Sequence, residues 1–465
     1  MDMKFKVDVP PFIRRLAATA KCKIYIVGGF IRNAALNLGN TDIDICGALL
    51  PEELGVDAEV IPINKRLGTA LITDGVTKAE YTPLRKESYG PGGEHSPLAV
   101  SFGATIAEDV RRRDFTAGSV YYDVSEDRFV DPYGGLADIA DRILRAKDPE
   151  FTFADDGLRL MRLCRLAAET GFSIDGNTAA VAKKFAHRLK DISPERKKAE
   201  LDRILVADFK YGVKDAHYRG LCLMREFGLW QYVLPSVAAM DGVKQNPKYH
   251  LYDVMEHSFM AVRYAPADVR LAALMHDVGK PPCMAKDGNT YNHPQVGAEI
   301  VKVELGQNGL KYPNAVVEEV ALLTRLHMYD MQGNAKESKV RIFVAEHFDI
   351  IPKLVALIKA DGKATGTKEE IITHRFTVVY KKLIEENAPV KLSMLKVDGN
   401  DVVASGIKGK QVSETLKLLW RECILDPTRN DRRLLLGRIK REAKRHCKAK
   451  NGNNFINSQS DDAEV

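Results

Sequence analysis

The sequence predicts an α+β fold, in which a small mixed sheet near the N-terminus is followed by helices. Short apolar or alternating runs, separated by turn residues, continue to about residue 140. From about residue 150 the strand signals fade, and helical spacing dominates to about residue 447. We expect strands at 24–27, 41–46, 58–63, 69–73 and 76–82.

The composition narrows the class of protein. The chain has 465 residues, enough for about three domains, and a net charge of +6 permits a nucleic-acid partner without requiring one. No apolar run reaches the ~20 residues of a membrane helix, and the N-terminus lacks the apolar core of a signal peptide. The seven cysteines are scattered, so we expect a cytoplasmic protein without disulfides.

The segment 23–46 combines a glycine turn with paired carboxylates. A buried strand leads to Gly28 and Gly29, a helix follows, and a second strand places Asp42 and Asp44 on one face, because strand side chains alternate. Two adjacent carboxylates favour a divalent cation such as Mg²⁺, and a glycine turn beside it indicates a nucleoside triphosphate. The alternative is an Asp-x-Asp pair on a solvated loop or strand end, which is common.

The remaining elements follow in chain order. We expect a helix over 30–38 that ends at Gly39, a loop over 84–97 because this segment is rich in Gly and Pro, and a short helix near 106–111. A clear helix is expected over 155–170, with an acidic first turn that suits the helix dipole.

Three residues of that last helix are spaced by three. Asp156, Arg159 and Arg162 can line one face, where a carboxylate and a guanidinium offer both an acceptor and donors to a nucleobase edge. The alternative is an ordinary ion pair on a helix surface, which stabilises by about 0.2–0.5 kcal/mol and has no function.

Five motifs occur in a fixed order: GGFIR with DID, RRDFT at 112–116, DPYGG at 131–135, DDGLR at 155–159, and ER at 195–196 followed by Glu200. Residues 23 to about 205 thereby resemble the head and neck of the tRNA nucleotidyltransferase and poly(A) polymerase family, in its bacterial-type (class II) branch. The resemblance implies a polymerase-beta-like nucleotidyltransferase head with a small mixed sheet, followed by an all-helical neck.

The resemblance also implies roles for the motif residues. Asp42 and Asp44 would be catalytic and bind Mg²⁺, since phosphoryl transfer needs positioning and charge neutralisation. Glu80 is a candidate third carboxylate, although we favour slightly its interpretation as an edge-strand charge. The residues expected to bind nucleotide are Gly28, Gly29 and Arg32 at the triphosphate, Arg113 and Asp114 at the ribose and triphosphate, and Asp156, Arg159 and Arg162 at the base.

The sequence departs from the family pattern at three positions. Asn33 stands where Asp commonly follows the GG-x-x-R motif, Gly118 replaces the Asn after RRDFT, and Asp155 replaces a Glu. Asn33 can still hydrogen-bond and Asp155 keeps its charge, whereas Gly118 lacks a side chain. We expect altered bracing of the active-site strand rather than altered metal chemistry.

A second set of metal-type ligands lies between residues 250 and 361. It comprises His257, His276, Asp277, His293, His327 and Asp361, in the order H…HD…H…H…D. Imidazole with carboxylate suits divalent first-row metals. This part resembles the HD phosphohydrolase domain, which implies a metal-dependent phosphatase or 2′,3′-cyclic phosphodiesterase acting on RNA ends; the alternative is a scaffold that keeps its histidines. His250, seven residues before His257, is interpreted as structural or capping.

The predicted domains are a head (1–145), a helical neck for base recognition and RNA binding (146–240), an HD domain (241–365), a helical tRNA-binding region (366–450) and a disordered tail (451–465). Basic residues crowd 183–203 and 432–450, and either cluster can be a solvated face or a surface that follows phosphates. The segment 392–419 also resembles the tail of HD-bearing CCA-adding enzymes.

Together with these observations, the resemblance implies an enzyme that adds CCA to the 3′ end of tRNA from CTP and ATP. The alternatives are a poly(A) polymerase, an A-only or CC-only tRNA nucleotidyltransferase, an HD phosphohydrolase with an RNA-binding head, and a structural RNA-binding protein.

Overall fold

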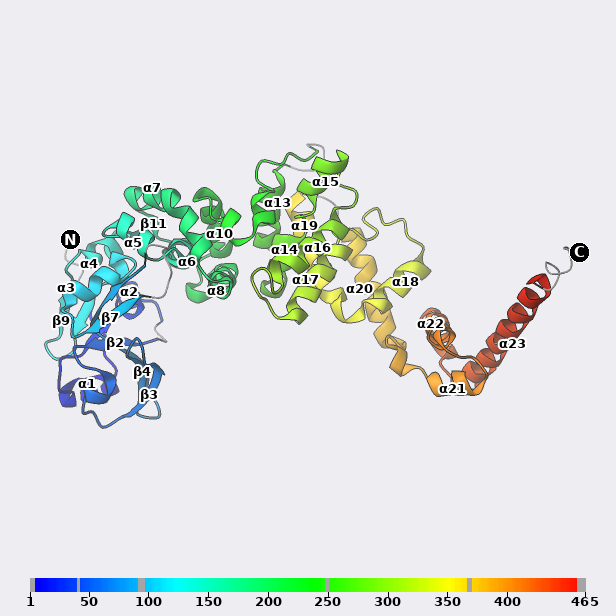
Figure 1. Cartoon of the computed structure of the whole chain (residues 1–465), viewed down its shortest axis with the longest axis horizontal. Coiled ribbons are helices and arrows are strands. Elements are labelled where there is room, and N and C mark those ends of the chain that lie inside the picture. Colours follow the sequence, from blue (N-terminus) through cyan, green and yellow to red (C-terminus); the bar gives the residue numbers. More distant parts are fainter. Residues whose placement is uncertain (1–4, 40–41, 91–96, 247–250, 366–369, 458–465) are drawn as a thin grey trace, which may run out of the picture.

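The computed structural model describes residues 5–39, 42–90, 97–246, 251–365 and 370–457. Figure 1 shows an elongated molecule, with the sheet-containing head at the N-terminal end, helices along the middle and a helical arm at the C-terminal end. This arrangement confirms the predicted α+β class. None of the described helices is long and apolar enough to span a membrane.

Seven strands form the sheet of the head in the order β3-β4-β5-β2-β1-β8-β9. The β2–β5 pair is parallel and the other neighbouring pairs are antiparallel, so the sheet is mixed as predicted. The strands are β1 (Tyr25–Val27), β2 (Asp44–Gly47), β3 (Glu59–Asn64), β4 (Thr69–Thr73), β5 (Lys78–Pro83), β8 (Tyr121–Asp123) and β9 (Arg128–Val130).

Apolar side chains attach helices to this sheet. Ile26 and Ile45, which are paired across β1 and β2, belong to one buried cluster with Ile13 of α1 (Pro11–Thr19) and Ile31 of α2 (Gly29–Ala35). α2 ends four residues before Gly39, the predicted cap. The other head helices are α3 (Ile106–Asp109) and α4 (Gly135–Ala140).

The segment 84–97 is only partly the predicted loop. Its first part is β6 (Arg85–Ser88), which pairs with β7 (Ala99–Phe102), and residues 91–96 lie outside the described part of the chain. A further short parallel pair, β10 (Ile143–Leu144) with β11 (Ser173–Ile174), ties the end of the head to the start of the neck.

The neck is helical, but the helix predicted over 155–170 is interrupted. α5 (Pro149–Asp155) ends before Asp156, whose backbone is extended, and α6 begins at Leu158. A Cβ at Gly157 would lie 2.5 Å from the carbonyl oxygen of Arg188, so the close packing here requires glycine. The other neck helices are α6 (Leu158–Thr170), α7 (Gly176–Phe185), α8 (Pro194–Leu205), α9 (Ala207–Tyr211), α10 (Ala216–Glu226), α11 (Trp230–Val233) and α12 (Pro235–Ala238).

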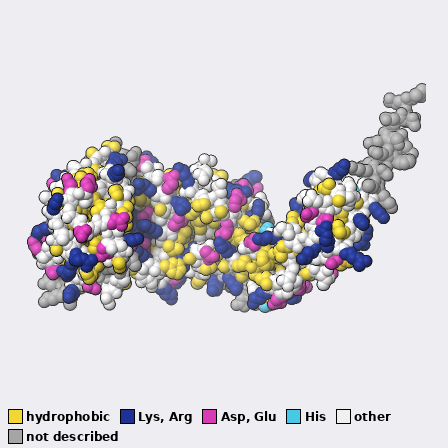
Figure 2. All heavy atoms as spheres, turned by 90° about the horizontal axis from the view of Figure 1, so that it is seen from below, with side chains coloured by type: hydrophobic (Ala, Val, Ile, Leu, Met, Phe, Trp, Pro, Cys, Tyr) yellow, Lys and Arg dark blue, Asp and Glu magenta, His cyan; other side chains and the backbone are white. Residues whose placement is uncertain are grey.

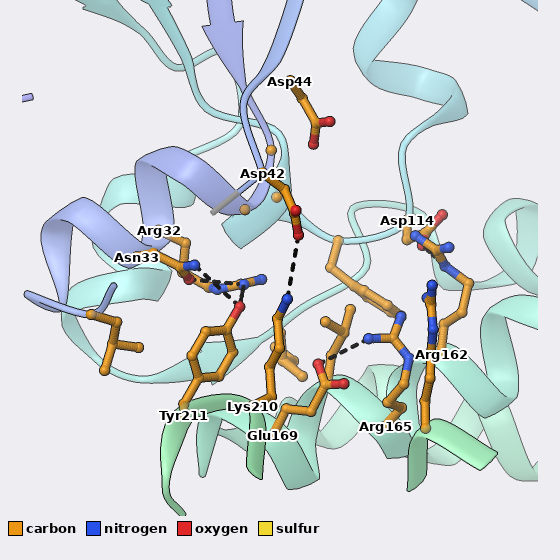
Figure 3. A pocket seen from close by; sticks show the side chains of 18 of the residues that line it. Arg32, Asn33, Asp42, Asp44, Asp114, Arg162, Arg165, Glu169, Lys210 and Tyr211 are labelled. Atoms are coloured by element: carbon orange, nitrogen blue, oxygen red, sulfur yellow. Dashed lines mark hydrogen bonds and ion pairs between the residues drawn. The ribbon is translucent and has the colours of Figure 1, made fainter. Parts of the chain in front are cut away.

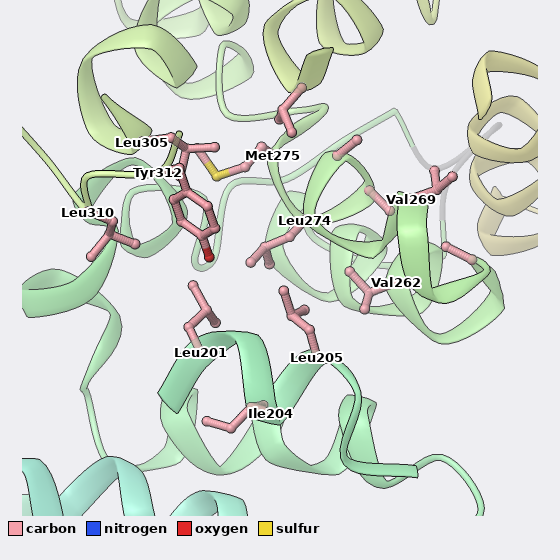
Figure 4. Close-up of a cluster of buried hydrophobic side chains, with 14 of the residues drawn as sticks. Leu201, Ile204, Leu205, Val262, Val269, Leu274, Met275, Leu305, Leu310 and Tyr312 are labelled. Atoms are coloured by element: carbon pink, nitrogen blue, oxygen red, sulfur yellow. The ribbon is translucent and has the colours of Figure 1, made fainter. Parts of the chain in front are cut away.

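Helices α13 to α20 form the middle of the molecule and pack directly on the neck. Figure 4 shows Leu201 and Leu205 of α8 facing Leu274, Met275 and Tyr312, all members of one buried apolar cluster. The helices are α13 (Val254–Tyr264), α14 (Arg270–Met275), α15 (Lys280–Asp287), α16 (His293–Leu305), α17 (Asn314–Leu326), α18 (Glu337–Glu346), α19 (Ile351–Thr365) and α20 (Glu370–Glu385).

The C-terminal arm comprises α21 (Gly399–Ala404), α22 (Lys410–Leu425) and α23 (Arg432–Asn457). α23 includes residues 451–457, which the sequence predicts to be disordered, and residues 458–465 lie outside the described chain. The predicted domain boundaries themselves stay a prediction.

Candidate active site

A cavity of about 1050 Å³ separates the head from the neck helices (Figure 3). The head contributes the glycine turn after β1, α2, the approach to β2 and residues 112–115, and the neck contributes α6, α8 and α9. The predicted site residues that line this cavity are Gly28, Gly29, Arg32, Asp42, Asp44, Arg113, Asp114 and Arg162. The structure therefore brings most of the predicted nucleotide site together around one space.

The turn at Gly28 lets the backbone approach a carboxylate closely. Gly28 has φ +81°, a left-handed conformation that side chains disfavour, and a Cβ there would lie 3.0 Å from Asp44 Oδ2. Gly29, which follows, is the first residue of α2. The two glycines thus leave room for both the carboxylate and a ligand beside the turn.

The two predicted metal carboxylates differ in environment. Asp44 is the first residue of β2, whereas Asp42 precedes the strand, so the prediction that both lie on one strand is wrong. The Asp42 side chain is 77% exposed and its Oδ2 lies 3.3 Å from Lys210 Nζ. Burial, followed by the charge of Glu80, raises the pKa of Asp44 to about 6, although Arg113 opposes this. Asp44 therefore carries a charge that this environment does not fully compensate.

Glu80 is directly beside Asp44. The parallel register of β2 and β5 pairs these two residues. β5 lies between β4 and β2 in the sheet, so the interpretation of Glu80 as an edge-strand charge is wrong. Glu80 is not among the described residues that line the cavity. It nevertheless adds negative charge next to a carboxylate that already needs a cation.

Arg113 is fixed by a buried network. Its Nε donates to the Tyr121 hydroxyl at 2.8 Å, and the hydroxyl donates to Asp109 at 2.6 Å. Burial would raise the pKa of Asp109, but Arg113 and Arg112 outweigh it and lower this pKa to about 2. Asp109 and Tyr121 were not predicted as part of the site; the only signal in the sequence is that Asp109 lies four residues before Arg113.

Asp114 joins the cavity to the predicted base-reading pair. Its carboxylate pairs with Arg162, and Asp114 Oδ1 lies 3.3 Å from Arg159 Nε. Burial opposes ionisation of Asp114, but Arg162 and Arg159 keep its pKa below the usual range. Asp156 Oδ2 lies 3.8 Å from Arg159 Nε. Asp156 and Arg159 do not line the cavity; they lie directly behind Asp114 among the described residues.

The ion pair between these two residues is buried rather than on a helix surface. Arg159 is 2% exposed, and its guanidinium donates to the carbonyl oxygens of Thr152 at 3.1 Å and Arg112 at 2.7 Å. Burial raises the pKa of Asp156 to about 6, against the effect of Arg159. The interpretation as a solvated ion pair is therefore wrong.

Helix α9 brings side chains to the cavity that the sequence analysis did not identify. The Tyr211 hydroxyl accepts hydrogen bonds from Arg32 at 2.9 Å and from Asn33 at 3.1 Å, and Lys210 contacts Asp42 (Figure 3). These contacts join the neck to the head over about 170 residues of sequence. A five-residue helix gives no periodic signal, so only the fold reveals them.

The structure shows the surroundings of Asn33 and Gly118, two of the three positions at which the sequence departs from the family pattern. Asn33 Oδ1 accepts from Arg32 at 3.0 Å, so the amide at this position braces the arginine as an aspartate would. Gly118 lines the cavity, and a Cβ there would meet nothing within 4 Å. The space beside Gly118 is therefore open rather than filled by other side chains.

Six ligand-type side chains converge in the middle of the molecule, as the sequence predicts. Two groups could hold a metal ion: His257, His276 and Asp277, and Asp277, His293 and His327. Asp277 belongs to both groups. Asp361 completes the set, with Oδ1 at 2.9 Å from His257 Nε2. His250 lies outside the described residues.

Three of these histidines are oriented by backbone carbonyls. The Nδ1 atoms of His276, His293 and His327 lie 2.7, 2.6 and 2.6 Å from carbonyl oxygens three residues earlier. The Nε2 atoms of the same rings lie 3.3, 3.2 and 3.9 Å from Asp277 oxygens, so they gather beside this carboxylate. A ring held through Nδ1 with Nε2 left for the metal is the usual arrangement of metal-binding histidines. Burial lowers the pKa of His327 to about 3, which favours the neutral ligand form. Burial would also lower the pKa of His276, but Asp277 and Asp361 outweigh it and raise this pKa to about 10, so a bound cation would take the place of a proton there. The donor set therefore fits a divalent metal.

The basic residues at 183–203 are only partly paired with carboxylates. Lys183, Lys184 and Lys198 pair with carboxylates at distances between 2.8 and 3.1 Å. These three pairs favour a solvated face for this part of the cluster, while Arg203 at its end has only a long ion pair, at 3.9 Å from Glu200.

The basic cluster on the C-terminal arm is less paired with carboxylates than the cluster on the neck. Figure 2 shows Lys and Arg side chains gathered on this arm. In the described part of the chain, Arg433, Lys440, Arg441 and Lys444 of α23 are exposed and have no carboxylate partner. The second cluster therefore retains free positive charge.

Comparisons with known proteins match the head, the neck and the middle of the chain. Residues 24–145 match the Poly A polymerase head domain, 171–240 the probable RNA and SrmB-binding site of polymerase A, and 248–374 the HD domain. The chain is 30% identical to an A-adding tRNA nucleotidyltransferase of Deinococcus radiodurans, over 73% of this chain and 76% of the relative. It is also 30% identical to a CC-adding tRNA nucleotidyltransferase of Thermus thermophilus, over 84% and 88%.

The fold resembles a solved structure over nearly its whole length. The crystal structure of the Bacillus stearothermophilus CCA-adding enzyme in complex with CTP aligns with a TM-score of 0.66 and 21% identity, covering 95% of this chain and 100% of that one. At this identity the likeness concerns the fold alone.

Proposed function

The chain belongs to the tRNA nucleotidyltransferase and poly(A) polymerase family, and we propose that it adds CCA to the 3′ end of tRNA from CTP and ATP without a nucleic-acid template. The observation that carries this proposal is the shared cavity, in which Asp42 and Asp44 of the head face Arg162 and Lys210 of the neck. Carboxylates on one wall and cations on the other suit a metal-bound triphosphate whose base points into the neck.

The proposal assigns divalent cations, with Mg²⁺ as the expected ion, to Asp42 and Asp44. The raised pKa of Asp44 beside Glu80 and Asp42 supports this, because an excess of buried negative charge favours a cation. When bound, such cations neutralise the triphosphate and activate the attacking hydroxyl. Arg32 and the amides of the Gly28–Gly29 turn would hold the phosphates, and Asp114 would accept a hydrogen bond from a ribose hydroxyl.

Asp156 and Arg159 are proposed as the base-reading pair. A carboxylate accepts from the exocyclic amine of cytosine or adenine, and a guanidinium donates to a ring acceptor, so the pair can select C and A over U and G. The relatives differ in this property, since one is named A-adding and another CC-adding. An A-only or CC-only enzyme is therefore the second candidate, and a poly(A) polymerase the third.

The test is incorporation of labelled CTP or ATP, each alone and then together, into tRNA that ends before CCA. Addition of two C residues and one A is expected, whereas long A tails or the absence of C incorporation would refute the first choice. The double variant Asp42→Ala with Asp44→Ala should abolish addition. If addition survives, the chain is an HD phosphohydrolase with an RNA-binding head.

The HD site is proposed to be a metal-dependent phosphohydrolase that acts on phosphate or 2′,3′-cyclic phosphate at RNA ends. His257, His276, Asp277, His293, His327 and Asp361 would hold the metal. Hydrolysis of a 2′,3′-cyclic nucleotide with added divalent metals tests this. No turnover with any metal, while CCA addition is intact, would leave the domain as a scaffold.

The proposed partner is tRNA, held along its acceptor arm or elbow by the free cations of α23. Such binding uses shape and phosphates rather than base edges, so affinity should fall steeply with salt. The proposal includes a cytoplasmic location, which the six free cysteines of the described chain support, since reduced thiols are typical of that compartment.

A further inference from the structure

The neck side of the cavity carries an exposed aromatic ring. Phe209 of α9 lines the cavity and is 67% exposed, the largest exposure of any phenylalanine in the described chain. Val206, 40% exposed, lies beside it on the same wall. Together the two side chains give this polar cavity an apolar wall, which suits a ligand with an apolar face.

The ring is held from one side by an immobile guanidinium. Arg270 of α14 lies with its guanidinium carbon 5.5 Å from the centre of the Phe209 ring. Arg270 is buried and donates to Asp208 at 2.6 and 2.8 Å, to Leu205 O at 2.7 Å and to Ala265 O at 3.2 Å. Because these contacts fix both Arg270 and the helix turn that carries Phe209, the exposed face of the ring is pre-organised.

Two cations with long ion pairs, Arg203 and Lys210, line the same cavity as the exposed face of Phe209. The Arg203 side chain is 63% exposed and its ion pair with Glu200 is long, at 3.9 Å. Lys210, the residue after Phe209, reaches Asp42. An aromatic face beside exposed cations is the usual way in which proteins bind single-stranded nucleic acid, by stacking a base and contacting its phosphate.

The elements that carry them separate Phe209 from the proposed base-reading pair. Phe209 lies on α9 with Lys210 and Tyr211, whereas Asp156 and Arg159 lie behind Asp114 at the start of α6. Figure 3 shows Lys210 and Tyr211 at one side of the cavity and Asp114 and Arg162 at the other. The incoming base is assigned to the Asp114 side. The opposite side, next to Asp42, is where an acceptor hydroxyl has to arrive.

We propose that Phe209 is the stacking platform for the unpaired 3′-terminal nucleotide of the RNA acceptor, with Arg203 at its phosphate. This inference rests on the proposed function and deepens it. Phe209 is thus a positioning residue, because it orients the acceptor rather than touching the reacting phosphate. Any of the four bases offers a face to stack, so the platform suits an end that changes from the discriminator base to C during synthesis.

The experiment uses the full chain and a tRNA transcript ending before CCA, with 2-aminopurine as the 3′-terminal nucleotide. Stacking on Phe209 should quench the fluorescence on binding, and Phe209→Ala should remove this quenching and raise the KM for the acceptor about tenfold. The KM for CTP and kcat at saturating RNA should change less than twofold. Phe209→Trp should retain both quenching and KM.

Tyr291→Ala is the matched control, since Tyr291 is 93% exposed and lies outside the cavity lining. It should leave acceptor KM and quenching unchanged. Equal quenching and acceptor KM in wild type and Phe209→Ala would overturn the platform while wild-type CMP incorporation still upheld the proposed function. Failure of the wild type to extend any RNA would instead overturn the proposed function.

Discussion

Replacing Asp44 by asparagine should stabilise the metal-free protein while it removes activity. Asn keeps the shape of the side chain but carries no charge. In the folded chain the pKa of Asp44 is about 6, compared with 3.8 for an ordinary Asp. A difference of about 2 in pKa corresponds to about 3 kcal/mol at pH values above 6, at 1.36 kcal/mol for each pKa unit. Because the carboxylate is only partly shielded from water, we expect about 1–2 kcal/mol.

Proton linkage determines how the stabilising effect of Asp44→Asn changes with pH. The folded chain holds the proton on Asp44 more tightly than the unfolded chain, so ionisation of Asp44 opposes folding. This cost is absent below about pH 4, develops as the pH rises towards 6, and is complete above it. The stabilising effect of Asp44→Asn should therefore be largest near pH 8 and should shrink as the pH falls below 6.

The assay is differential scanning calorimetry in EDTA at pH 8 and pH 5. We expect Asp44→Asn to raise the midpoint of the transition of the head by about 3–6 °C at pH 8, and by less at pH 5. Asp42→Asn is the control: its side chain is 77% exposed, so its midpoint should move little. If Asp44→Asn lowers the midpoint, or raises it equally at pH 8 and pH 5, then the charge of Asp44 does not destabilise the metal-free head and the reasoning is refuted.

Three further predictions concern neighbouring groups. Glu80→Gln should lower the rate of nucleotide addition by about tenfold or more, because Glu80 adds negative charge beside Asp44. The affinity for tRNA should stay unchanged. An unchanged rate at saturating substrates would show that Glu80 does not contribute to the reaction. Lys210→Met should reduce the Mg²⁺ concentration needed for half-maximal activity about two- to fivefold, because Lys210 competes with the cation for Asp42. An increase in this Mg²⁺ concentration would show instead that Lys210 helps to bind the triphosphate. His327→Ala should abolish hydrolysis of 2′,3′-cyclic phosphate without changing CMP incorporation, and parallel loss of both activities would contradict two separate sites.

Much of the fold could be predicted because its signals are local. Strand alternation and glycine turns identify β1, β2, β4 and β5 within a few residues. The HD ligands could also be predicted, because their order along the chain resembles that of the HD domain, and the structure brings them to one place.

What could not be predicted depends on pairing between distant segments. The neighbour of Asp44 is Glu80 because β2 and β5 run parallel, and the sequence alone does not define that register. The glycine at 157, beside the helix break at Asp156, is required by the backbone at Arg188, 31 positions along the chain. Likewise Tyr211 reaches Arg32 only because the neck folds back over the head.

The two arginines near Asp114 differ in how firmly they are held, and this bears on nucleotide choice. Arg159 is fixed by two backbone carbonyls in addition to Asp114, so it cannot rearrange between bases. Arg162 is anchored through Asp114 alone among the described contacts. The pairing edges of C and A offer the same kinds of groups on rings of different size, so a site that accepts both has to adjust its shape, and Arg162 is the side chain able to move. Arg162→Lys should therefore change the ratio of C to A incorporation; an equal loss of both would mean that Arg162 only supports Asp114.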